Sequence, residues 1–370
     1  MKILTVVGAR PQFVKAAVVS REIARRRAAG QDISEAIVHT GQHFDLNMSD
    51  VFFTEMGIPR PDHALTLGGL SHGAMTGRML EEIERILLAD RPDWVLVYGD
   101  TNSTLAGALA AVKLHIDVAH VEAGLRSWNR AMPEEINRIA TDHVSTLLFA
   151  PTASAVANLA NEGVPAERIV RTGDVMQDAA LHYAAAARSR PLPEGVAQPF
   201  ALVTVHRAEN TDDPVRLAAI VGALTDVAQR RKLVFPVHPR TRNALDKIGL
   251  LAALEAHATL LPPVGYLDMV ALEAAAAVIV TDSGGVQKEA YFFAKPCVTL
   301  RTETEWTELV AAGANVLVAP NDRAAMAGAI DAAFGRSVDT SGRLYGDGNA
   351  AAQIVDALCA PRPADGSSTP

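Results

Sequence analysis

Val278-Ile279-Val280-Thr281-Asp282-Ser283-Gly284-Gly285-Val286-Gln287-Lys288-Glu289 is the stretch that decides the fold. A short apolar run passes into a polar, glycine-containing turn and then into a segment with helical spacing, which predicts a strand, a tight loop and a helix. In open α/β sheets, ligands bind beyond the carboxyl ends of the strands, where such loops lead into helix N-termini. The free backbone N–H groups and the helix dipole at Ser283, Gly284 and Gly285 therefore favour a phosphate-binding loop.

Two simpler interpretations of this loop stay open. Asp282 or Ser283 would serve equally as an ordinary N-cap of the following helix, with no ligand involved. Glu289, further along that helix, would accept hydrogen bonds from ribose hydroxyls or would simply be a surface charge.

The same alternation of apolar run and helical segment recurs on both sides of this loop and predicts an α/β protein with parallel sheets covered on both faces. The expected strands are Ile3–Val7, Ala36–His39, Trp94–Tyr98, Val118–Val121, Leu147–Ala150, Phe200–Val205, Leu233–Val237, Val278–Thr281, Cys297–Leu300 and Asn315–Val318. The expected helices of the first half include Gln12–Arg27, Thr76–Ala89, Ser103–Leu114 and Glu134–Val144.

A chain of 370 residues exceeds the size of most single cores, so two Rossmann-like domains with a cleft between them are expected. The Pro- and Gly-rich segment 189–195 is typical of a linker. We expect an N-terminal domain over 1–172 and a C-terminal, nucleotide-binding domain over 173–347. A final helix over 348–360 is expected to pack back on the first domain, followed by a flexible tail over 361–370.

Composition excludes several classes of function. The formal net charge of −8 leaves no basic surface for nucleic acid or anionic membranes. No apolar stretch is long enough to span a bilayer. Cys297 and Cys359 fit no metal or redox spacing, so both are interpreted as buried small apolar residues of a cytoplasmic protein.

Polar residues gather at the ends of six expected strands. Arg10 lies in the first such loop, and Lys15 lies in the helix that follows. Both suggest cations directed at an anionic ligand, with structural salt bridges as the alternative. The six loops are Gly8–Pro11, Gly99–Asn102, Glu122–Gly124, His206–Arg207, His238–Arg240 and Ser283–Gly285.

Two cofactor classes are disfavoured by the same loops. NAD binding requires G-x-G-x-x-G after the first strand and an acidic residue after the second, and the chain has neither. His206 and His238 have no His or Cys partner at metal-binding spacing, and the neighbouring Arg207 and Arg240 would repel a cation. We therefore expect neither NAD nor a metal.

The reactive side chains at these loops are four carboxylates and two histidines, namely Asp100, Glu122, Glu134, Glu135, His206 and His238. Asp100 would act in proton transfer or as a helix cap. Glu122 follows an apolar strand, where burial would raise its pKa toward that of a usable acid or base. Glu134 and Glu135 would be catalytic groups or acids that favour the first turn of a helix.

With these motifs assembled, the chain resembles the non-hydrolysing UDP-N-acetylglucosamine 2-epimerase family over nearly all of residues 1–360. The matching blocks are GARPQFVK from Gly8, HTGQH from His39, YGDTNST from Tyr98, HVEAGLRS from His120, MPEEINR from Met132, VTVHRAEN from Val203, VHPRTR from Val237 and TDSGGVQKEA from Thr281. The resemblance implies the GT-B-type fold of a large class of glycosyltransferases, with UDP between the domains.

The resemblance also implies roles for particular residues. Those implied in catalysis are Asp100, Glu122, Glu134 and His206. Those implied around UDP are Arg10, Lys15, His206, His238, Ser283, Gly284, Gly285 and Glu289. A homodimer that serves polysaccharide biosynthesis, acts on a UDP-sugar and needs neither NAD nor a metal is implied as well.

The chemistry of such an epimerase explains this set. The C2 proton of the sugar is not adjacent to a carbonyl, so it leaves by elimination as UDP departs from C1, and a glycal forms. Inversion requires a proton to return on the opposite face of C2 while UDP adds back to C1. Acid and base groups are therefore needed on both sides of the ring, and Asp100, Glu122 and Glu134 would supply them, while Arg10 and the Ser-Gly-Gly loop stabilise the departing diphosphate.

Departures from the usual family pattern bear on the substrate. This chain has Gly8-Ala9-Arg10-Pro11-Gln12 and Thr304-Glu305-Trp306-Thr307-Glu308 where ordinary members tend to have GTRPE and TERPE, and Gly173-Asp174 where they have Gly-Asn. These differences favour the branch acting on UDP-2,3-diacetamido-2,3-dideoxy-D-glucuronate. Arg78 or Arg130 would then pair with the uronate, or remain a solvated surface charge.

Three alternatives remain. UDP-N-acetylglucosamine and UDP-N-acetylmannosamine interconversion would use the same groups. A glycosyltransferase of the same fold would keep the UDP site but need an acceptor groove. A silent nucleotide-sugar binder is disfavoured because every implied catalytic position carries a suitable residue.

Overall fold

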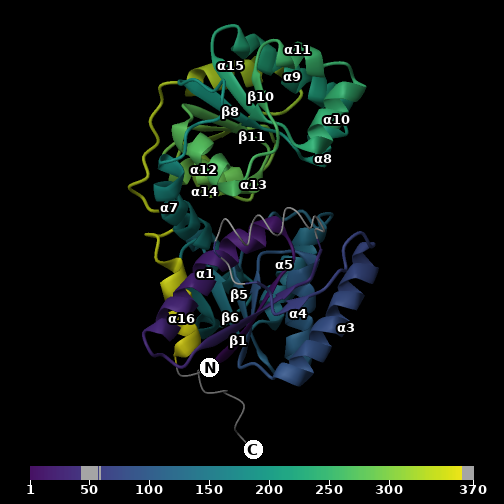
Figure 1. Cartoon of the computed structure of the whole chain (residues 1–370), viewed down its shortest axis with the longest axis vertical. Coiled ribbons are helices and arrows are strands. Elements are labelled where there is room, and N and C mark those ends of the chain that lie inside the picture. Colours follow the sequence, from purple (N-terminus) through teal and green to yellow (C-terminus); the bar gives the residue numbers. More distant parts are fainter. Residues whose placement is uncertain (43–56, 58–59, 361–370) are drawn as a thin grey trace, which may run out of the picture. The chain divides into compact units, whose positions relative to one another are not determined.

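The computed structural model describes residues 1–42, 57 and 60–360, and its fold consists of two compact units (Figure 1). One unit comprises Met1–Ala179 and the chain from Leu344 onward, and the other comprises Ala180–Arg343. We call them the first and the second unit. Each is a parallel sheet between helices, so the predicted α/β class with two domains is confirmed. The predicted tail 361–370 and residue His43 of the HTGQH block lie outside the described residues.

The first unit is built on a seven-stranded parallel sheet in the order β3-β2-β1-β4-β5-β6-β7. Its strands are β1 (Lys2–Val7), β2 (Ser34–His39), β3 (His63–Ala64), β4 (Trp94–Tyr98), β5 (Asp117–Val121), β6 (Leu147–Ala150) and β7 (Ile169–Arg171). Its helices are α1 (Arg10–Ala28), α3 (His72–Asp90), α4 (Asn102–Lys113), α5 (Pro133–Val144), α6 (Ala153–Asn161), the 3₁₀ turn η1 (Ala166–Arg168) and α16 (Ala350–Cys359).

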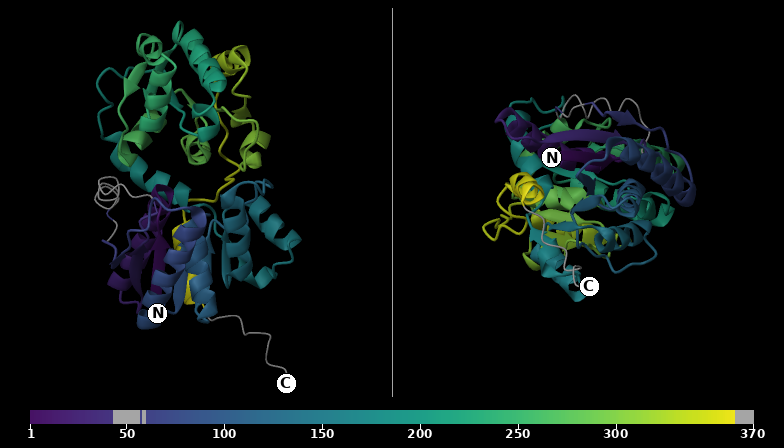
Figure 2. Two further views of the ribbon diagram at one scale, coloured as in Figure 1. Left: turned by 90° about the vertical axis from the view of Figure 1, so that its right-hand side faces the viewer. Right: turned by 90° about the horizontal axis from the view of Figure 1, so that it is seen from below.

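Helices cover both faces of this sheet, which explains why its strands are almost continuously apolar. Leu4 and Val6 of β1 point to one face and pack in a core with Met79 and Ile83 of α3. On the C-terminal side, α16 packs against α1, where Arg26 and Asp356 form an ion pair of 2.6 Å (Figures 1 and 2). The last described helix therefore belongs to the first unit.

The second unit contains a six-stranded parallel sheet in the order β10-β9-β8-β11-β12-β13. Its strands are β8 (Phe200–Thr204), β9 (Lys232–Pro236), β10 (Thr259–Leu261), β11 (Val278–Thr281), β12 (Cys297–Thr299) and β13 (Asn315–Leu317). Its helices are α8 (Ala208–Thr211), α9 (Pro214–Ala228), α10 (Pro239–Lys247), α11 (Leu251–Glu255), α12 (Tyr266–Ala275), α13 (Gly284–Phe292), α14 (Thr307–Ala311) and α15 (Arg323–Ala333). Helix α7 (Val175–Arg188) runs across the division after Ala179, which lies seven residues beyond the boundary expected from sequence.

Alternation along β8 builds a core on each face of the second sheet. Ala201 and Val203 join the core formed with α9 and α15, whereas Phe200 and Leu202 join the core formed with α12 and α13. The strands therefore hold the loops after β8, β9 and β11 rigidly at one edge of the sheet, which is where the predicted site residues of this unit lie.

One expectation about the cysteines is wrong. Cys297 is buried in β12, but Cys359 is exposed near the end of α16, where its sulfur accepts a hydrogen bond from the Gln31 amide at 3.1 Å. The helical pattern at 349–358 did not indicate which face of α16 its last turn would present to solvent.

Candidate active site

Gln12 organises the strand ends of the first unit. Its side-chain oxygen accepts the backbone N–H groups of Gly8 and Ala9, at 2.8 and 3.0 Å, and its amide nitrogen donates to the carbonyl of Tyr98 at 2.7 Å. The loops after β1 and β4 are thereby joined through one buried side chain. A glutamate at this position would lack the donor for Tyr98, so Gln12 is a functional choice that sequence reasoning treated only as a departure from a motif.

Gly8 makes this approach possible. A Cβ atom on Gly8 would lie 2.1 Å from Oγ of Ser103 and 2.2 Å from Oγ1 of Thr40, which is too close for any side chain. The helix after β1 therefore begins directly against the loop after β4. Arg10 is the first residue of α1, and its side chain lies outside the described part of the structure.

Asp100 does not cap a helix. Thr101 caps α4, with its hydroxyl accepting the Thr104 N–H group, and the Asp100 carboxylate instead pairs with Arg138 of α5 at 2.5 Å. About one third of the Asp100 side chain is exposed, whereas Arg138 is buried. The structure thus gives Asp100 a fixed cation partner and an open edge, as proton transfer to a ligand requires.

Glu122 is held in a left-handed backbone conformation, with φ of 73°. This conformation is uncommon outside glycine and persists where the surroundings fix it, typically at functional sites. The Glu122 carboxylate forms an ion pair with the ammonium of Lys15, and both side chains are about nine-tenths buried. Gly99 lies beside this pair, because a Cβ on Gly99 would be 3.2 Å from Lys15 Nζ and 3.4 Å from Glu122 Oε2. The structure therefore brings Lys15, Glu122 and the Gly99-Asp100 loop together.

Glu134 and Glu135 have different surroundings although they are neighbours. Glu135 is buried and accepts the backbone N–H groups of Ser127 and Trp128, each at 3.0 Å, as well as Arg138 at 2.8 Å. Glu134 is exposed in the first turn of α5. Glu135 is thus a structural anchor for the loop that precedes α5, and Glu134 is the carboxylate of this pair that is accessible to a ligand.

In the second unit, Asp282 joins the loops after β8 and β11. Its carboxylate is fully buried and accepts the backbone N–H groups of His206 and Arg207, at 3.1 and 3.0 Å, and the side-chain amide of Asn210 at 3.0 Å. His206 is half exposed, with Nδ1 3.6 Å from the Asp282 carboxylate. Asp282 therefore fixes His206 and does not cap the helix that follows it.

The Ser283-Gly284-Gly285 segment begins α13 without a side-chain cap. Ser283 stands at the cap position, but its hydroxyl makes no cap bond, and its N–H group donates to Thr281 Oγ1 at 2.9 Å. The ordinary-cap interpretation is therefore wrong for both Asp282 and Ser283. A Cβ on Gly285 would meet no described atom within 4 Å, so open space lies beside the first turn of α13.

Glu289 of α13 is buried and faces a second carboxyl group, that of Glu273 on α12. Burial of Glu273, together with the charge and hydrogen bond of Glu289, raises the pKa of Glu273 well above its usual value. The two carboxyl groups therefore meet in a buried contact between α12 and α13. Glu273 stands in an ordinary helical pattern, and no motif indicated that it would face Glu289.

His238 lies near His206, with ring centroids 6.2 Å apart. Its ring nitrogen Nδ1 accepts the backbone N–H group of Arg240 at 3.2 Å and caps α10. The second unit therefore brings His206 and His238 together beside Asp282.

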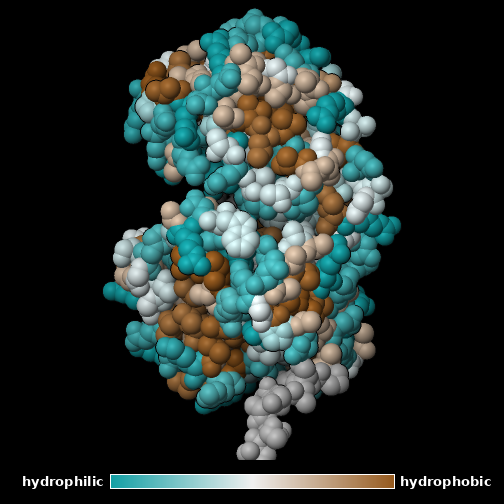
Figure 3. Space-filling model, turned by 180° about the vertical axis from the view of Figure 1, so that it is seen from behind, coloured by the Kyte–Doolittle hydropathy of each residue, from teal (hydrophilic) through white to brown (hydrophobic). Residues whose placement is uncertain are grey.

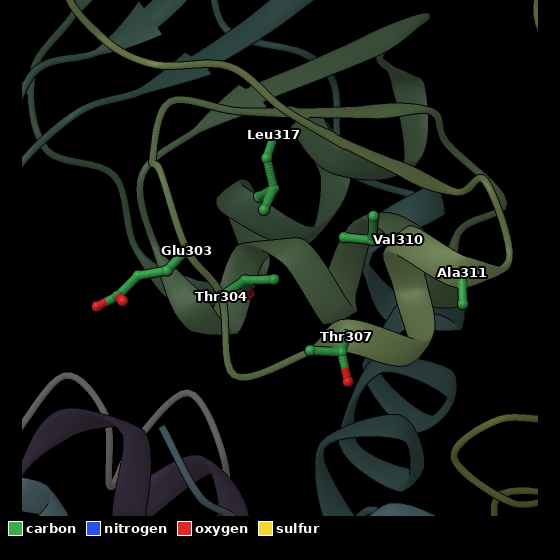
Figure 4. Close-up of a pocket in the computed structure, with 6 residues that line it drawn as sticks. All are labelled: Glu303, Thr304, Thr307, Val310, Ala311 and Leu317. Atoms are coloured by element: carbon green, nitrogen blue, oxygen red, sulfur yellow. The ribbon is translucent and has the colours of Figure 1, made fainter. Parts of the chain in front are cut away.

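A pocket of about 460 Å³ lies elsewhere in the second unit, between α14 and β13 (Figure 4). It is lined by Glu303, Thr304, Thr307, Val310, Ala311 and Leu317. None of these is a predicted site residue, and the Thr304 hydroxyl is already bonded to Gln287 at 2.7 Å. This mainly apolar hollow has no convergent polar groups, so it is not the candidate site.

Within the described residues, no three His, Cys, Asp or Glu side chains are placed to hold a metal ion together. None of the helices described is long and apolar enough to cross a membrane.

Comparison with known proteins identifies the family. The family model described as UDP-N-acetylglucosamine 2-epimerase matches residues 25–359. The chain belongs to this family. It is therefore an isomerase of the epimerase type, and the predicted family, enzyme class and GT-B-type fold are confirmed.

Individual relatives of this epimerase differ in their named substrate. A UDP-2,3-diacetamido-2,3-dideoxy-D-glucuronate 2-epimerase of Pseudomonas aeruginosa is 54% identical, over 97% of this chain and 99% of the relative. A UDP-N-acetylglucosamine 2-epimerase of Methanocaldococcus jannaschii is 43% identical, over 87% of this chain and 89% of the relative. The crystal structure of the M. jannaschii enzyme with UDP-GlcNAc and UDP matches with a TM-score of 0.87 and 40% identity. The match covers 97% of this chain and 99% of the chain in that structure.

Proposed function

We propose that this epimerase inverts C2 of UDP-2,3-diacetamido-2,3-dideoxy-D-glucuronate by elimination and re-addition of UDP. The observation that carries the proposal is the Lys15–Glu122 ion pair beside the Gly99-Asp100 loop, with Glu122 in a left-handed conformation. This arrangement puts Glu122 beside the residue that precedes Asp100 at the strand ends of the first unit, which supports a role for both carboxylates in proton exchange with a ligand.

In the first half-reaction, a carboxylate takes the C2 proton while the C1–O bond to UDP breaks, and a glycal with a C1–C2 double bond forms. In the second, a proton is delivered to the other face of C2 and a diphosphate oxygen re-forms the bond to C1. Asp100, Glu122 and Glu134 are the proposed proton-transfer groups, each differently held. Arg138 orients Asp100, Lys15 stabilises the charge of Glu122, and Glu134 is exposed to ligand. No hydride moves in either step, so we propose that turnover requires neither NAD nor a metal.

The second unit is proposed to retain UDP throughout. The open space beside Gly285 at the first turn of α13 supports a diphosphate position there, since unpaired N–H groups and the helix dipole favour an anion. Ser283 and Gly284 belong to the same turn. Glu289, on the same helix α13, is proposed to accept hydrogen bonds from the ribose hydroxyls. His206, His238 and Arg10 are proposed to bind the diphosphate. His206 is also proposed to take part in catalysis.

The choice of sugar is supported by the 54% identical relative and by the sequence departures at Gln12 and Trp306. A uronate adds a carboxylate that needs a cation. Arg130, exposed in the loop before α5, and Arg78, exposed on α3, are the proposed candidates. UDP-N-acetylglucosamine is the second candidate substrate, favoured by the relative from M. jannaschii. A likeness to glycosyltransferases concerns the fold alone.

One experiment tests reaction and substrate together. The protein is incubated in deuterated water with each UDP-sugar separately, and C2 is followed by NMR. We expect deuterium at C2 and the 2-epimer only with the diacetamido uronate. Exchange with UDP-N-acetylglucosamine alone reverses the substrate assignment, and no exchange with either sugar while UDP binds contradicts the epimerase mechanism.

We also propose a cytoplasmic homodimer. Large apolar side chains are exposed on the first unit, including Leu88 on α3 and Ile136 on α5, and hydrophobic patches are visible on the face of this unit in Figure 3. Exposed apolar patches commonly mark interfaces. Light scattering after size-exclusion chromatography measures the mass directly, and a particle of 39.2 kDa contradicts the dimer.

A further inference from the structure

His120 belongs to a chain of charged groups in which His120, Asp142 and Arg126 are fully buried and Glu162 is partly exposed. His120 is on β5, two residues before Glu122, and none of its side chain is exposed. Its Nδ1 atom is 2.7 Å from Asp142 Oδ1, and its Nε2 atom is 2.7 Å from the carbonyl oxygen of Gly99. Both ring nitrogens therefore contact oxygen atoms at short hydrogen-bond distance.

The nature of these two oxygens fixes the state of the ring. A carbonyl oxygen only accepts hydrogen bonds, and an ionised carboxylate likewise only accepts. Asp142 Oδ2 accepts hydrogen bonds from the Arg126 guanidinium at 2.7 Å and from the Gly124 N–H group at 3.0 Å, and these two donors stabilise its ionised form without any contribution from His120. Both nitrogens of His120 must then carry a proton.

The chain continues toward the surface through Arg126. The buried carboxylate of Asp142 accepts Arg126 Nη1 at 2.7 Å, and Arg126 forms two further bonds of 2.7 Å to Glu162, which is partly exposed. The cations His120 and Arg126 thus alternate with the carboxylates of Asp142 and Glu162 along the chain.

The chain connects both loops that carry the proposed catalytic carboxylates. His120 holds the carbonyl of Gly99, the residue before Asp100. Asp142 Oδ2 accepts the backbone N–H group of Gly124 at 3.0 Å, two residues after Glu122. Lys15 Nζ and Glu122 Oε2 also lie beside Gly99, at 3.2 and 3.4 Å from the position that a Cβ on this residue would take.

We propose that His120 is a positioning residue with a proton on both ring nitrogens, which fixes the Gly99-Asp100 loop relative to the Glu122-Gly124 loop through Gly99 and Asp142. The proposal adds a residue to the machinery and rests on the proposed epimerase function only for its kinetic consequence. His120 itself does not touch the sugar, since no part of its side chain reaches the surface.

Two measurements test it, one of them independent of activity. The protein is labelled with ¹⁵N-histidine, and the ring signals of His120 are assigned by their loss in His120→Gln. We expect both His120 ring nitrogens to bear a proton, as their two acceptor oxygens require. A ring with a single protonated nitrogen overturns the proposal, whether or not the wild-type protein epimerises either sugar.

The kinetic test compares His120→Gln with His143→Gln. His143 is the matched control, because it lies on α5 at the exposed outer end of the same chain, 3.1 Å from Glu162. We expect kcat of His120→Gln to fall about 10- to 100-fold, with KM within about twofold, because misplacement of catalytic groups has effects of this size. His143→Gln should retain full activity.

Asp142→Asn is the second variant, for the case that His120→Gln does not fold. The asparagine oxygen still accepts from Nδ1, but the counter-charge is gone, so we expect the ring to carry a single proton and kcat to fall. A folded His120→Gln or Asp142→Asn protein with wild-type kcat and unchanged UDP affinity overturns the positioning role. If the wild-type protein exchanges no deuterium at C2, the proposed function fails, and the NMR result still decides the state of His120.

Discussion

The buried carboxylate of Asp282 accepts the backbone N–H group of His206, and this bond holds the loop after β8 against the loop after β11. A second N–H group, from Arg207, and the amide of Asn210 complete the set of donors. His206 is therefore placed by a residue that never reaches the ligand. The unit that we propose to bind UDP is thus preorganised around one carboxylate.

Asp282→Asn is expected to weaken UDP binding and to lower stability. The amide group turns one acceptor into a donor that faces N–H groups, which leaves buried donors unsatisfied at a cost of about 1–3 kcal/mol. Urea denaturation measures the loss of stability, and calorimetry measures UDP affinity. Asp246→Asn on α10 is the control, and equal UDP affinity of a folded Asp282→Asn protein contradicts the proposed placement of His206.

Glu122→Gln is expected to reduce kcat by about 10²- to 10⁴-fold, the usual contribution of one acid or base group. The substitution keeps the size of the side chain but removes both its charge and its capacity for proton transfer. Deuterium incorporation at C2 under saturating substrate gives the rate. Glu81→Gln, on an exposed pair of α3 with Arg85, should leave it unchanged. Retention of the wild-type rate by Glu122→Gln removes this residue from the mechanism.

Arg138→Met is expected to affect stability and turnover through different partners. Arg138 bridges Glu135 at 2.8 Å and Asp100 at 2.5 Å. Its loss leaves the buried Glu135 without a cation, which costs about 3 kcal/mol. Adding Glu135→Gln removes the unpaired buried charge but turns one acceptor of the Ser127 and Trp128 N–H groups into a donor, so it should restore part of the stability, and not kcat, because Asp100 still lacks its partner. Full recovery of kcat in the double variant would show that Arg138 acts only on the fold.

The strands that sequence analysis missed share one property. β3, β7 and β10 lie at sheet edges and contain only two or three residues each. An edge strand pairs on one side only and needs no continuous apolar run, and these three have none longer than two residues, whereas the edge strand β13 (Asn315–Leu317) leads into the longer run 316–318 and was predicted. The central strands are buried on both faces, and for that reason their apolar runs predicted them closely.

The site was predictable in its residue types but not in its partners. Strand ends indicated Asp100, Glu122 and the Ser-Gly-Gly loop because parallel strands end at one edge of the sheet. Lys15 and Glu122 stand 107 residues apart in the chain, and Gln12 and Tyr98 stand 86 apart. Only the folded sheet brings such pairs together.

Glu35→Gln is expected to reduce the pH dependence of stability. Burial raises the pKa of Glu35 to about 7, from 4.5, despite a hydrogen bond from Thr5. A raised carboxyl pKa means that the folded state binds more protons than the unfolded state between these values, so the free energy of unfolding decreases as pH rises from 4.5 to about 7. The full decrease is up to about 3 kcal/mol. Denaturation of both proteins at about pH 5 and about pH 8 should show the variant gaining relative stability at the higher pH. If the free energies of unfolding of the variant and the wild type differ by the same amount at both pH values, the raised pKa of Glu35 is contradicted.

Gly285→Ala and Gly284→Ala separate the proposed diphosphate position from the stability of α13. A methyl group on Gly285 meets no described atom within 4 Å, whereas one on Gly284 lies 2.4 Å from Glu305 Oε1. In a helix, alanine is more stable than glycine by about 0.5–1 kcal/mol, so Gly285→Ala should melt no lower than the wild type. If the diphosphate packs on the first turn of α13, the same methyl group occupies its position, and UDP affinity should fall roughly tenfold or more. Gly284→Ala should instead displace Glu305 from Arg301, its partner at 3.0 Å, and lower the melting temperature. Calorimetric titration of UDP decides the matter, because undiminished affinity in a stable Gly285→Ala protein places the diphosphate elsewhere.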